Sequence, residues 1–182
     1  MFKHAIILPL KESFTIKNSG AVSIWVNDYI KSTKLKKEIA IIATKNFNKE
    51  DKYLKNQNLF TIKTRSNLRT NYNYIRDAAK VLMQNNIKSV EVHNRPEYAL
   101  YLNKTIPNIK INLIFHNDPN NIRGSSSQRE KISLINICSN IIFVSNYLKE
   151  IFFKGINTNH QNNIHIIYNS VDKQKKFPKK KK

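Results

Sequence analysis

The stretch SVEVHNRPEYALYLNKTIPNIKINLIFHN, residues 89–117, alternates two short apolar runs with one amphipathic segment. Residues 89–93 and 109–115 have the length and the β-branched content of buried strands. Pro96 opens a helical segment between them that ends near Asn103. Two strands joined by a helix favour a parallel pair with a crossover connection. This stretch therefore predicts an α/β fold.

The same alternation continues in both directions along the chain. It predicts a Rossmann-like, mostly parallel sheet with helices on both faces, built from one domain over residues 1–172. Further strands are expected at residues 4–10, 38–44, 59–64, 140–144 and 164–168, and further helices at 20–31, 71–85, 125–138 and 145–153.

The chain of 182 residues carries a net charge of +20. Its last ten residues, 173–182, hold seven lysines and are expected to form a disordered tail. The charge indicates attraction to an anionic membrane surface. Nucleic acid is disfavoured, because joint enrichment in Lys, Asn and Ile also follows from genome base composition. No apolar run approaches the roughly 20 residues that cross a bilayer, and no signal peptide is recognisable. We expect a cytoplasmic protein, peripheral on the inner face of the membrane. The single Cys138 is expected in the core.

Only three glycines, Gly20, Gly124 and Gly155, occur in the chain, and they lie far apart. Neither a dinucleotide-binding glycine fingerprint nor a phosphate-binding P-loop can be built from them. Nicotinamide oxidoreductases and P-loop ATPases are therefore excluded. No Cys/His cluster has the spacing of metal ligands, so no metal or other cofactor is expected.

Polar residues gather where the expected strands end, at positions 9–20, 93–97, 116–119 and 145–146. In open α/β sheets ligands bind beyond the carboxyl ends of the strands. This clustering favours an active site over an inert module.

The sequence resembles the amino-terminal domain of family 4 retaining glycosyltransferases, which have the GT-B fold of two facing Rossmann-like domains. The likeness is closest to enzymes of lipopolysaccharide and capsular glycan synthesis. The motifs that carry it are Ser19-Gly20-Ala21-Val22, His93-Asn94-Arg95-Pro96, Phe115-His116-Asn117, residues 142–149, and residues 165–172 as the interdomain signature.

The resemblance implies a metal-free transfer from a nucleotide-sugar to a glycan or glycolipid acceptor. His116 would be the catalytic residue and donate a hydrogen bond to a hydroxyl of the donor sugar; the alternative is a structural histidine. Ser19 and Gly20 would offer amides to the donor phosphates, or Ser19 would only cap a helix. Acceptor-binding residues would be Glu12, His93, Asn94, Arg95 and Glu97.

Several alternatives stay open. Arg95 could form an ordinary surface salt bridge. We interpret Ser145 and Asn146 as a helix cap. We interpret Trp25 and Tyr29 as core residues. Two departures from the family pattern are Ser19 in place of a glycine and Ser170 in place of the signature glycine.

The chain stops where the family's second domain begins. It is therefore expected to be inactive without a separate carboxyl-terminal domain, as in a split or frameshifted gene. The competing classes are a non-catalytic basic module that binds anionic membrane or nucleic acid, and half of a sugar-nucleotide epimerase.

Overall fold

The computed structural model describes residues 1–15, 19–44, 58–64, 70–157 and 163–169. The expected lysine-rich tail and residues 170–172 of the interdomain signature lie outside the described residues. In the part that is described, no helix has the length and apolar character needed to span a bilayer.

In the described ranges seven strands form one sheet, and every neighbouring pair is parallel. Their order is β3-β2-β1-β4-β5-β6-β7, so the chain builds outward from β1 in one direction and then continues from β4 in the other. The boundary between β1 and β4 is a topological switch point, where ligands of such sheets bind. The strands are β1 (His4–Ile7), β2 (Ile39–Thr44), β3 (Leu59–Ile62), β4 (Ser89–His93), β5 (Lys110–Phe115), β6 (Asn140–Phe143) and β7 (Ile164–Ile166).

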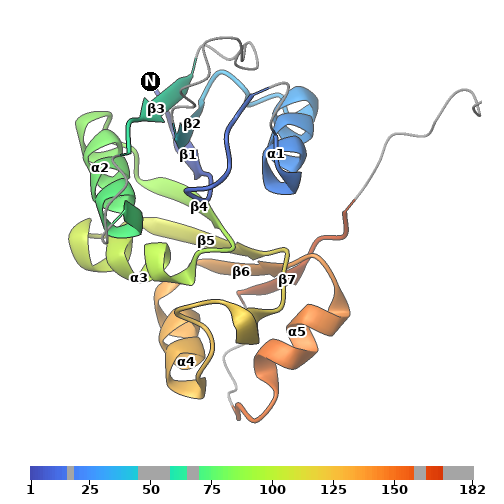
Figure 1. Cartoon of the computed structure of the whole chain (residues 1–182). Helices are drawn as coiled ribbons and strands as arrows, with labels where there is room; N and C mark the ends of the chain where they lie inside the picture. Colours follow the sequence, from blue (N-terminus) through green and yellow to red (C-terminus); the bar gives the residue numbers. More distant parts are fainter. Residues whose placement is uncertain (16–18, 45–57, 65–69, 158–162, 170–182) are drawn as a thin grey trace, which may run out of the picture.

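The helices lie on both faces of the sheet, as the sequence predicts (Figure 1). One face is covered by α1, and the other by the remaining four helices. A short 3-10 helix, η1 (Pro119–Asn121), follows β5 and was not expected. The α-helices are α1 (Ala21–Ser32), α2 (Thr70–Gln84), α3 (Pro96–Thr105), α4 (Gln128–Ile137) and α5 (Asn146–Phe153).

Local sequence explains where several helices begin. Ser127 and Glu130 form a capping box at the start of α4, in which each residue binds the other's backbone amide. Ser145 Oγ accepts a hydrogen bond from the Leu148 amide and caps α5, which confirms the cap reading of that residue. Pro96 occupies the first turn of α3, where its missing amide hydrogen costs nothing.

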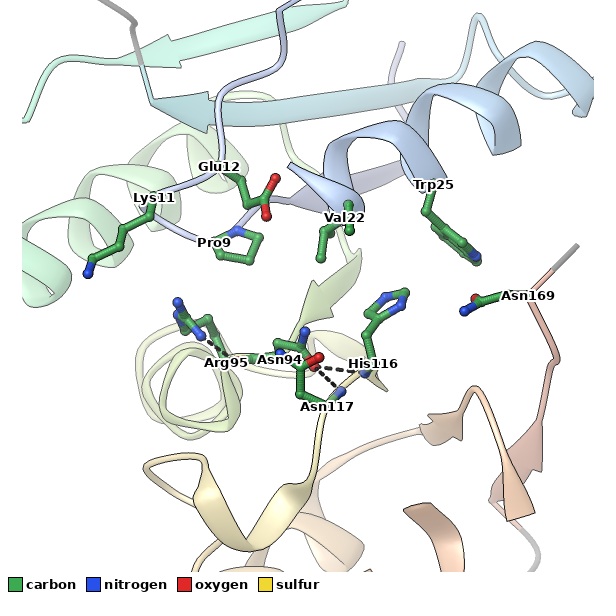
Figure 2. Close-up of a pocket in the computed structure, with 11 residues that line it drawn as sticks. Pro9, Lys11, Glu12, Val22, Trp25, Asn94, Arg95, His116, Asn117 and Asn169 are labelled. Carbon is green, nitrogen blue, oxygen red and sulfur yellow. Dashed lines mark hydrogen bonds between the residues drawn. The ribbon is translucent and has the colours of Figure 1, made fainter. Parts of the chain in front are cut away.

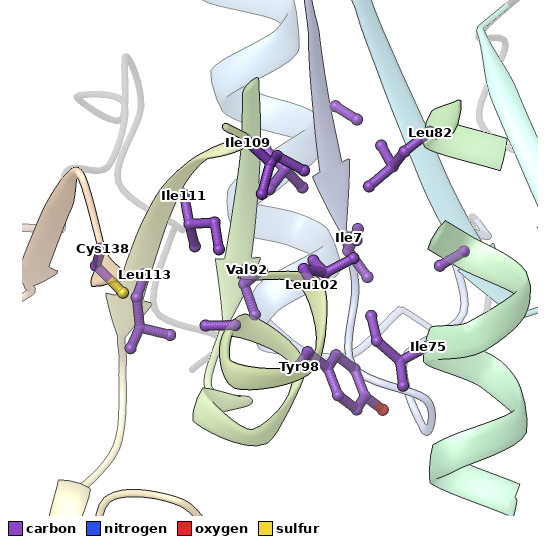
Figure 3. Close-up of a cluster of buried hydrophobic side chains, with 14 of the residues drawn as sticks. Ile7, Ile75, Leu82, Val92, Tyr98, Leu102, Ile109, Ile111, Leu113 and Cys138 are labelled. Atoms are coloured by element: carbon purple, nitrogen blue, oxygen red, sulfur yellow. The ribbon is translucent and has the colours of Figure 1, made fainter. Parts of the chain in front are cut away.

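Two apolar clusters fix the sheet between its helices. The larger packs β-strand side chains such as Ile7, Val92 and Leu113 against α2 to α5, and Cys138 is buried in it as expected (Figure 3). The smaller packs β1 and β2 against Val22 and Val26 of α1. Because both faces are packed, the ends of the strands are held in fixed relative positions.

Candidate functional site

A cavity of about 310 Å³ lies at the carboxyl ends of β1, β4 and β5, beside the start of α1 (Figure 2). It therefore sits at the switch point of the sheet. Four predicted site residues line it together: Glu12, Asn94, Arg95 and His116. The other lining residues are Pro9, Lys11, Ala21, Val22, Trp25, Asn117 and Asn169.

The carboxylate of Glu12 lies at the amino end of α1. Its Oε2 accepts a hydrogen bond from Ser23 Oγ at 3.0 Å and lies 3.4 Å from Ser23 N. Gly20 makes this approach possible, because a Cβ built there would lie 2.2 Å from Glu12 Oε2. A negative group at a helix start is favoured by the free amides and the helix dipole. The chain thus places its own carboxylate where the sequence suggested donor phosphates.

Ser19 does not cap α1. The cap position is Gly20, which has no side-chain hydrogen bond there, and Ser19 Oγ donates instead to the carbonyl oxygen of Thr15. The alternative reading of Ser19 as an N-cap is therefore wrong. Ala21 and Val22 at the start of the helix are the residues of this motif that reach the cavity.

Asn94 joins the ends of β4 and β5. Its Oδ1 accepts hydrogen bonds from the backbone amides of His116 at 2.7 Å and Asn117 at 3.2 Å (Figure 2). Its φ of 51° is in the left-handed region, which asparagine tolerates better than most residues. The side chain of Asn94 is buried, so it fixes the position of His116 more than it offers atoms to a ligand.

His93 is fully buried and lies behind His116, so it has no exposed surface with which to line an acceptor groove. Its Nδ1 is 3.0 Å from His116 Nε2, and the two rings are nearly parallel. On its other side, Nε2 of His93 is 3.6 Å from Oε2 of Glu91. Glu91 also contacts His4, with 3.1 Å between Oε1 and Nε2.

Burial and neighbouring side chains together set the pKa values of His116 and Glu91. Burial, and then the electrostatic effect of the adjacent His93 side chain, lower the pKa of His116 to about 3. Burial disfavours the charged form of Glu91, but the nearby His4 and His93 side chains outweigh this effect and lower the pKa of Glu91 to about 2. His116 is therefore a neutral imidazole at the cavity, with a buried carboxylate two contacts away.

Trp25 was expected in the core, and it does pack against the smaller apolar cluster. It also lines the cavity, where its ring meets those of His93 and His116 edge-on at centroid distances of 5.3 and 5.5 Å. Tyr29 stacks on its other side at 5.7 Å. An aromatic wall beside polar groups is a common way to hold a sugar ring or a base.

A second cavity of about 460 Å³ adjoins the first through Arg95 and Asn117. Glu97 lines it, so this residue is separated from the cavity that holds His116. Burial raises the pKa of the Glu97 carboxyl, although Arg95 and Arg123 partly oppose the rise. The salt bridge considered for Arg95 is not among the ion pairs of the described residues, and its Nη1 donates to the Asn94 carbonyl at 2.7 Å.

Lys11 and Asn117 also line the cavity. They lie in the strand-end segments 9–20 and 116–119 that the sequence singles out, although neither was named as a site residue. Sequence reasoning missed Trp25 and Asn169, and the strand-end rule could have included Asn169, which follows β7. Among the described residues, no three His, Cys, Asp or Glu side chains are grouped so as to hold a metal ion.

Comparison with known proteins supports the fold. The Anabaena protein HepE, solved with UDP and glucose, aligns over 94% of this chain and 45% of its own, with a TM-score of 0.63 and 10% identity. A glycosyltransferase from Rickettsia africae aligns over 94% of this chain and 44% of its own, with a TM-score of 0.61 and 20% identity. UDP-N-acetylglucosamine 2-epimerase from Rickettsia bellii aligns over 90% of this chain and 43% of its own, with a TM-score of 0.54 and 12% identity.

No family model and no curated protein matches the sequence. The chain spans less than half the length of the solved structures that it resembles. These likenesses establish the fold: a Rossmann-like α/β domain of the kind that forms one half of a GT-B structure.

Proposed function

We propose that this chain is the acceptor-side half of a nucleotide-sugar-dependent glycosyltransferase of the family 4 type that builds a cell-envelope glycan. The observation that carries the proposal is the convergence of His116, Arg95 and Glu12 on one cavity at the switch point of the sheet. The GT-B likeness supports it, since two of the similar structures are a glycosyltransferase and a protein solved with UDP and glucose.

In the proposed reaction an acceptor hydroxyl oxygen forms a bond to the anomeric carbon of the donor sugar. The bond from that carbon to the nucleoside diphosphate breaks, and the diphosphate leaves with the electron pair. The hydroxyl proton passes to solvent or to the leaving group. His116 and Trp25 are placed to contact the sugar, and Lys11 and Arg95 to attract anionic groups of donor or acceptor.

Stabilisation of the departing diphosphate is the largest requirement of this chemistry. The amides at the start of α1 supply part of it once Glu12 moves aside. We expect the rest from a second domain, because the similar structures are about twice as long as this chain. We expect no metal ion in the reaction, with amides and basic side chains in its place.

The experiment uses Trp25, which is the only tryptophan in the chain and lines the cavity. UDP-glucose, UDP-N-acetylglucosamine and octyl glucoside are titrated while its fluorescence is followed. We expect a saturable change with at least one of them that is weakened in His116→Asn. Trp25→Phe is the control for signals that arise elsewhere. No saturable response to any of the three would overturn the proposal.

An epimerase half is the second candidate, because two UDP-N-acetylglucosamine 2-epimerases share the fold at TM-scores of 0.54 and 0.53. Proton NMR of UDP-N-acetylglucosamine mixed with the chain and a separately expressed carboxyl-terminal domain distinguishes the two. An epimerase converts the nucleotide-sugar into its C2 epimer without an acceptor. A transferase leaves the sugar configuration at C2 unchanged and releases UDP only when an acceptor is present.

The alternative function is a basic, non-catalytic module that binds anionic membrane or nucleic acid, and the net charge of +20 favours it. Its signature is binding to anionic vesicles or to nucleic acid that falls steeply as salt rises. We expect weak vesicle binding of this kind alongside the cavity response of Trp25. Strong polyanion binding with no Trp25 response to sugars would favour the alternative. The inner membrane face is the place where we expect the chain to work.

A further inference from the structure

We propose that Glu91 and His93 are positioning residues that fix which nitrogen of His116 carries its proton. His116 then offers Nδ1 to the cavity as a hydrogen-bond acceptor for a substrate hydroxyl. The identity of that substrate rests on the proposed function, whereas the placement of the proton does not.

The three side chains form a line from the interior of the sheet to the cavity. Glu91 and His93 lie two residues apart on β4, so they share one face of the strand. His116 follows β5, the neighbouring strand. The contacts are 3.6 Å from Glu91 Oε2 to His93 Nε2 and 3.0 Å from His93 Nδ1 to His116 Nε2.

The first contact determines the tautomer of His93. Both atoms of that contact are buried, and neither has a hydrogen-bond partner elsewhere in the described part of the chain. An ionised carboxylate only accepts hydrogen bonds. A bare Nε2 facing it would place two lone pairs together in a dry site, which is costly. The proton of His93 therefore lies on Nε2, directed at Glu91.

The contact between His93 Nδ1 and His116 Nε2 then determines the tautomer of His116. A His93 ring that carries one proton, on Nε2, has a lone pair on Nδ1 and accepts a hydrogen bond there. The nitrogen facing it, Nε2 of His116, must be the donor. His116 therefore keeps its proton on Nε2, and its Nδ1 is left with a lone pair.

Nδ1 is therefore the atom of His116 that is available to a ligand. His116 lines the cavity, and its Nδ1 has no hydrogen-bond partner among the residues that the structure describes. The burial that lowers the pKa of His116 keeps the ring neutral. A sugar hydroxyl can donate to such a nitrogen. The direction is opposite to the sequence expectation, in which His116 donates to the sugar.

Nitrogen NMR of the full chain, labelled with ¹⁵N at its histidines, tests the proposal at pH 7.5. Long-range proton–nitrogen correlations report which ring nitrogen of each histidine holds the proton. His93→Asn and His116→Asn assign the two patterns. We expect both His93 and His116 to be protonated at Nε2 with a bare Nδ1.

Glu91→Gln removes the charge at nearly constant shape, and it should convert the single His93 and His116 patterns into mixtures of tautomers. The matched control is Glu38→Gln, since Glu38 pairs with Lys3 at the surface. The control should leave both patterns unchanged. His165, which contacts Asn140 on β6, serves as a spectator within each sample.

A proton on Nδ1 of His116 in the wild-type chain would overturn the proposal, and so would tautomers that Glu91→Gln leaves untouched. If Glu91→Gln does not fold, the wild-type spectrum alone decides. The spectra need no sugar, so they separate this proposal from the proposed function. Correct tautomers without a Trp25 response to sugars would reject only the latter.

Discussion

Oε2 of Glu12 and Oγ of Ser23 lie 3.0 Å apart, so a carboxylate of this chain occupies the start of α1. The loop after β1 brings Glu12 there, and Gly20 leaves the space for it. A nucleoside diphosphate bound at the same helix end would meet this negative charge. Binding of such a ligand at this helix end would therefore require Glu12 to move away from Ser23.

Glu12→Gln should strengthen the binding of UDP. Removal of one like charge at a helix start changes the binding free energy by about 1 kcal/mol, which is roughly a fivefold gain in affinity. The gain should shrink as salt rises, because screening weakens the repulsion. Isothermal titration calorimetry at two salt concentrations measures both effects. Glu38→Gln, with the same change of charge at a remote surface ion pair, should bind UDP like the wild type. Equal affinities for all three proteins would show that UDP does not bind near Glu12.

Gly20→Ala should destabilise the wild-type chain and have almost no effect in a Glu12→Ala background. The backbone at Gly20 has φ −78°, which alanine adopts freely, so the cost arises only from the added Cβ. That Cβ would displace the Glu12 carboxylate from Ser23. A double-mutant cycle from urea unfolding should give a coupling free energy of about 1 kcal/mol. Additive effects would contradict the contact.

Asn94→Ala should cost more stability than Asn94→Gly. Both changes remove the two hydrogen bonds to the amides of His116 and Asn117. Alanine also has to hold φ at 51°, a strain of about 1 kcal/mol that glycine does not have. Urea unfolding of both variants measures the difference. Unfolding free energies in the reverse order would show that the backbone leaves the left-handed region.

The free energy of unfolding should fall as pH is lowered from about 6.5 toward 3. In the unfolded chain His116 binds a proton with the ordinary histidine pKa of 6.5, whereas the folded chain holds that pKa at about 3. The unfolded state thus binds more protons in this range, and acid favours it. Protonation of Glu91 also favours the unfolded state as pH falls, because its pKa is 4.5 in the unfolded chain and about 2 in the folded chain. In urea unfolding between pH 7 and 4, His116→Asn should have a shallower slope, by up to about 1 kcal/mol per pH unit. Parallel slopes for the two proteins would rule out a depressed pKa at His116.

Much of the fold could be predicted from the sequence, because short apolar runs alternate with amphipathic segments along most of the chain. Residues 38–44 were expected as a strand and form β2 (Ile39–Thr44), and the strand expected at residues 89–93 matches β4. The strand-end rule then placed Glu12, Arg95 and His116 together, since the carboxyl ends of parallel strands share one edge.

The depth of each site residue could not be predicted. His93 and His116 both read as strand-end histidines, but the register pairs His93 with Ile114, two residues before His116. His93 is therefore inside the sheet and His116 beyond it. A register offset of this size leaves no trace in the sequence. The fold of the loop after β1, which carries Glu12 to α1, is likewise a tertiary result.

The line of contacts from Glu91 through His93 to His116, with Asn94 holding the last of them, has an evolutionary consequence. A change at any one of these four positions removes a contact that a polar atom of another makes. Homologous chains should therefore vary them as a set, exchanging all four or keeping all four, and covariation at these sites should exceed that of the solvent-facing residues around them.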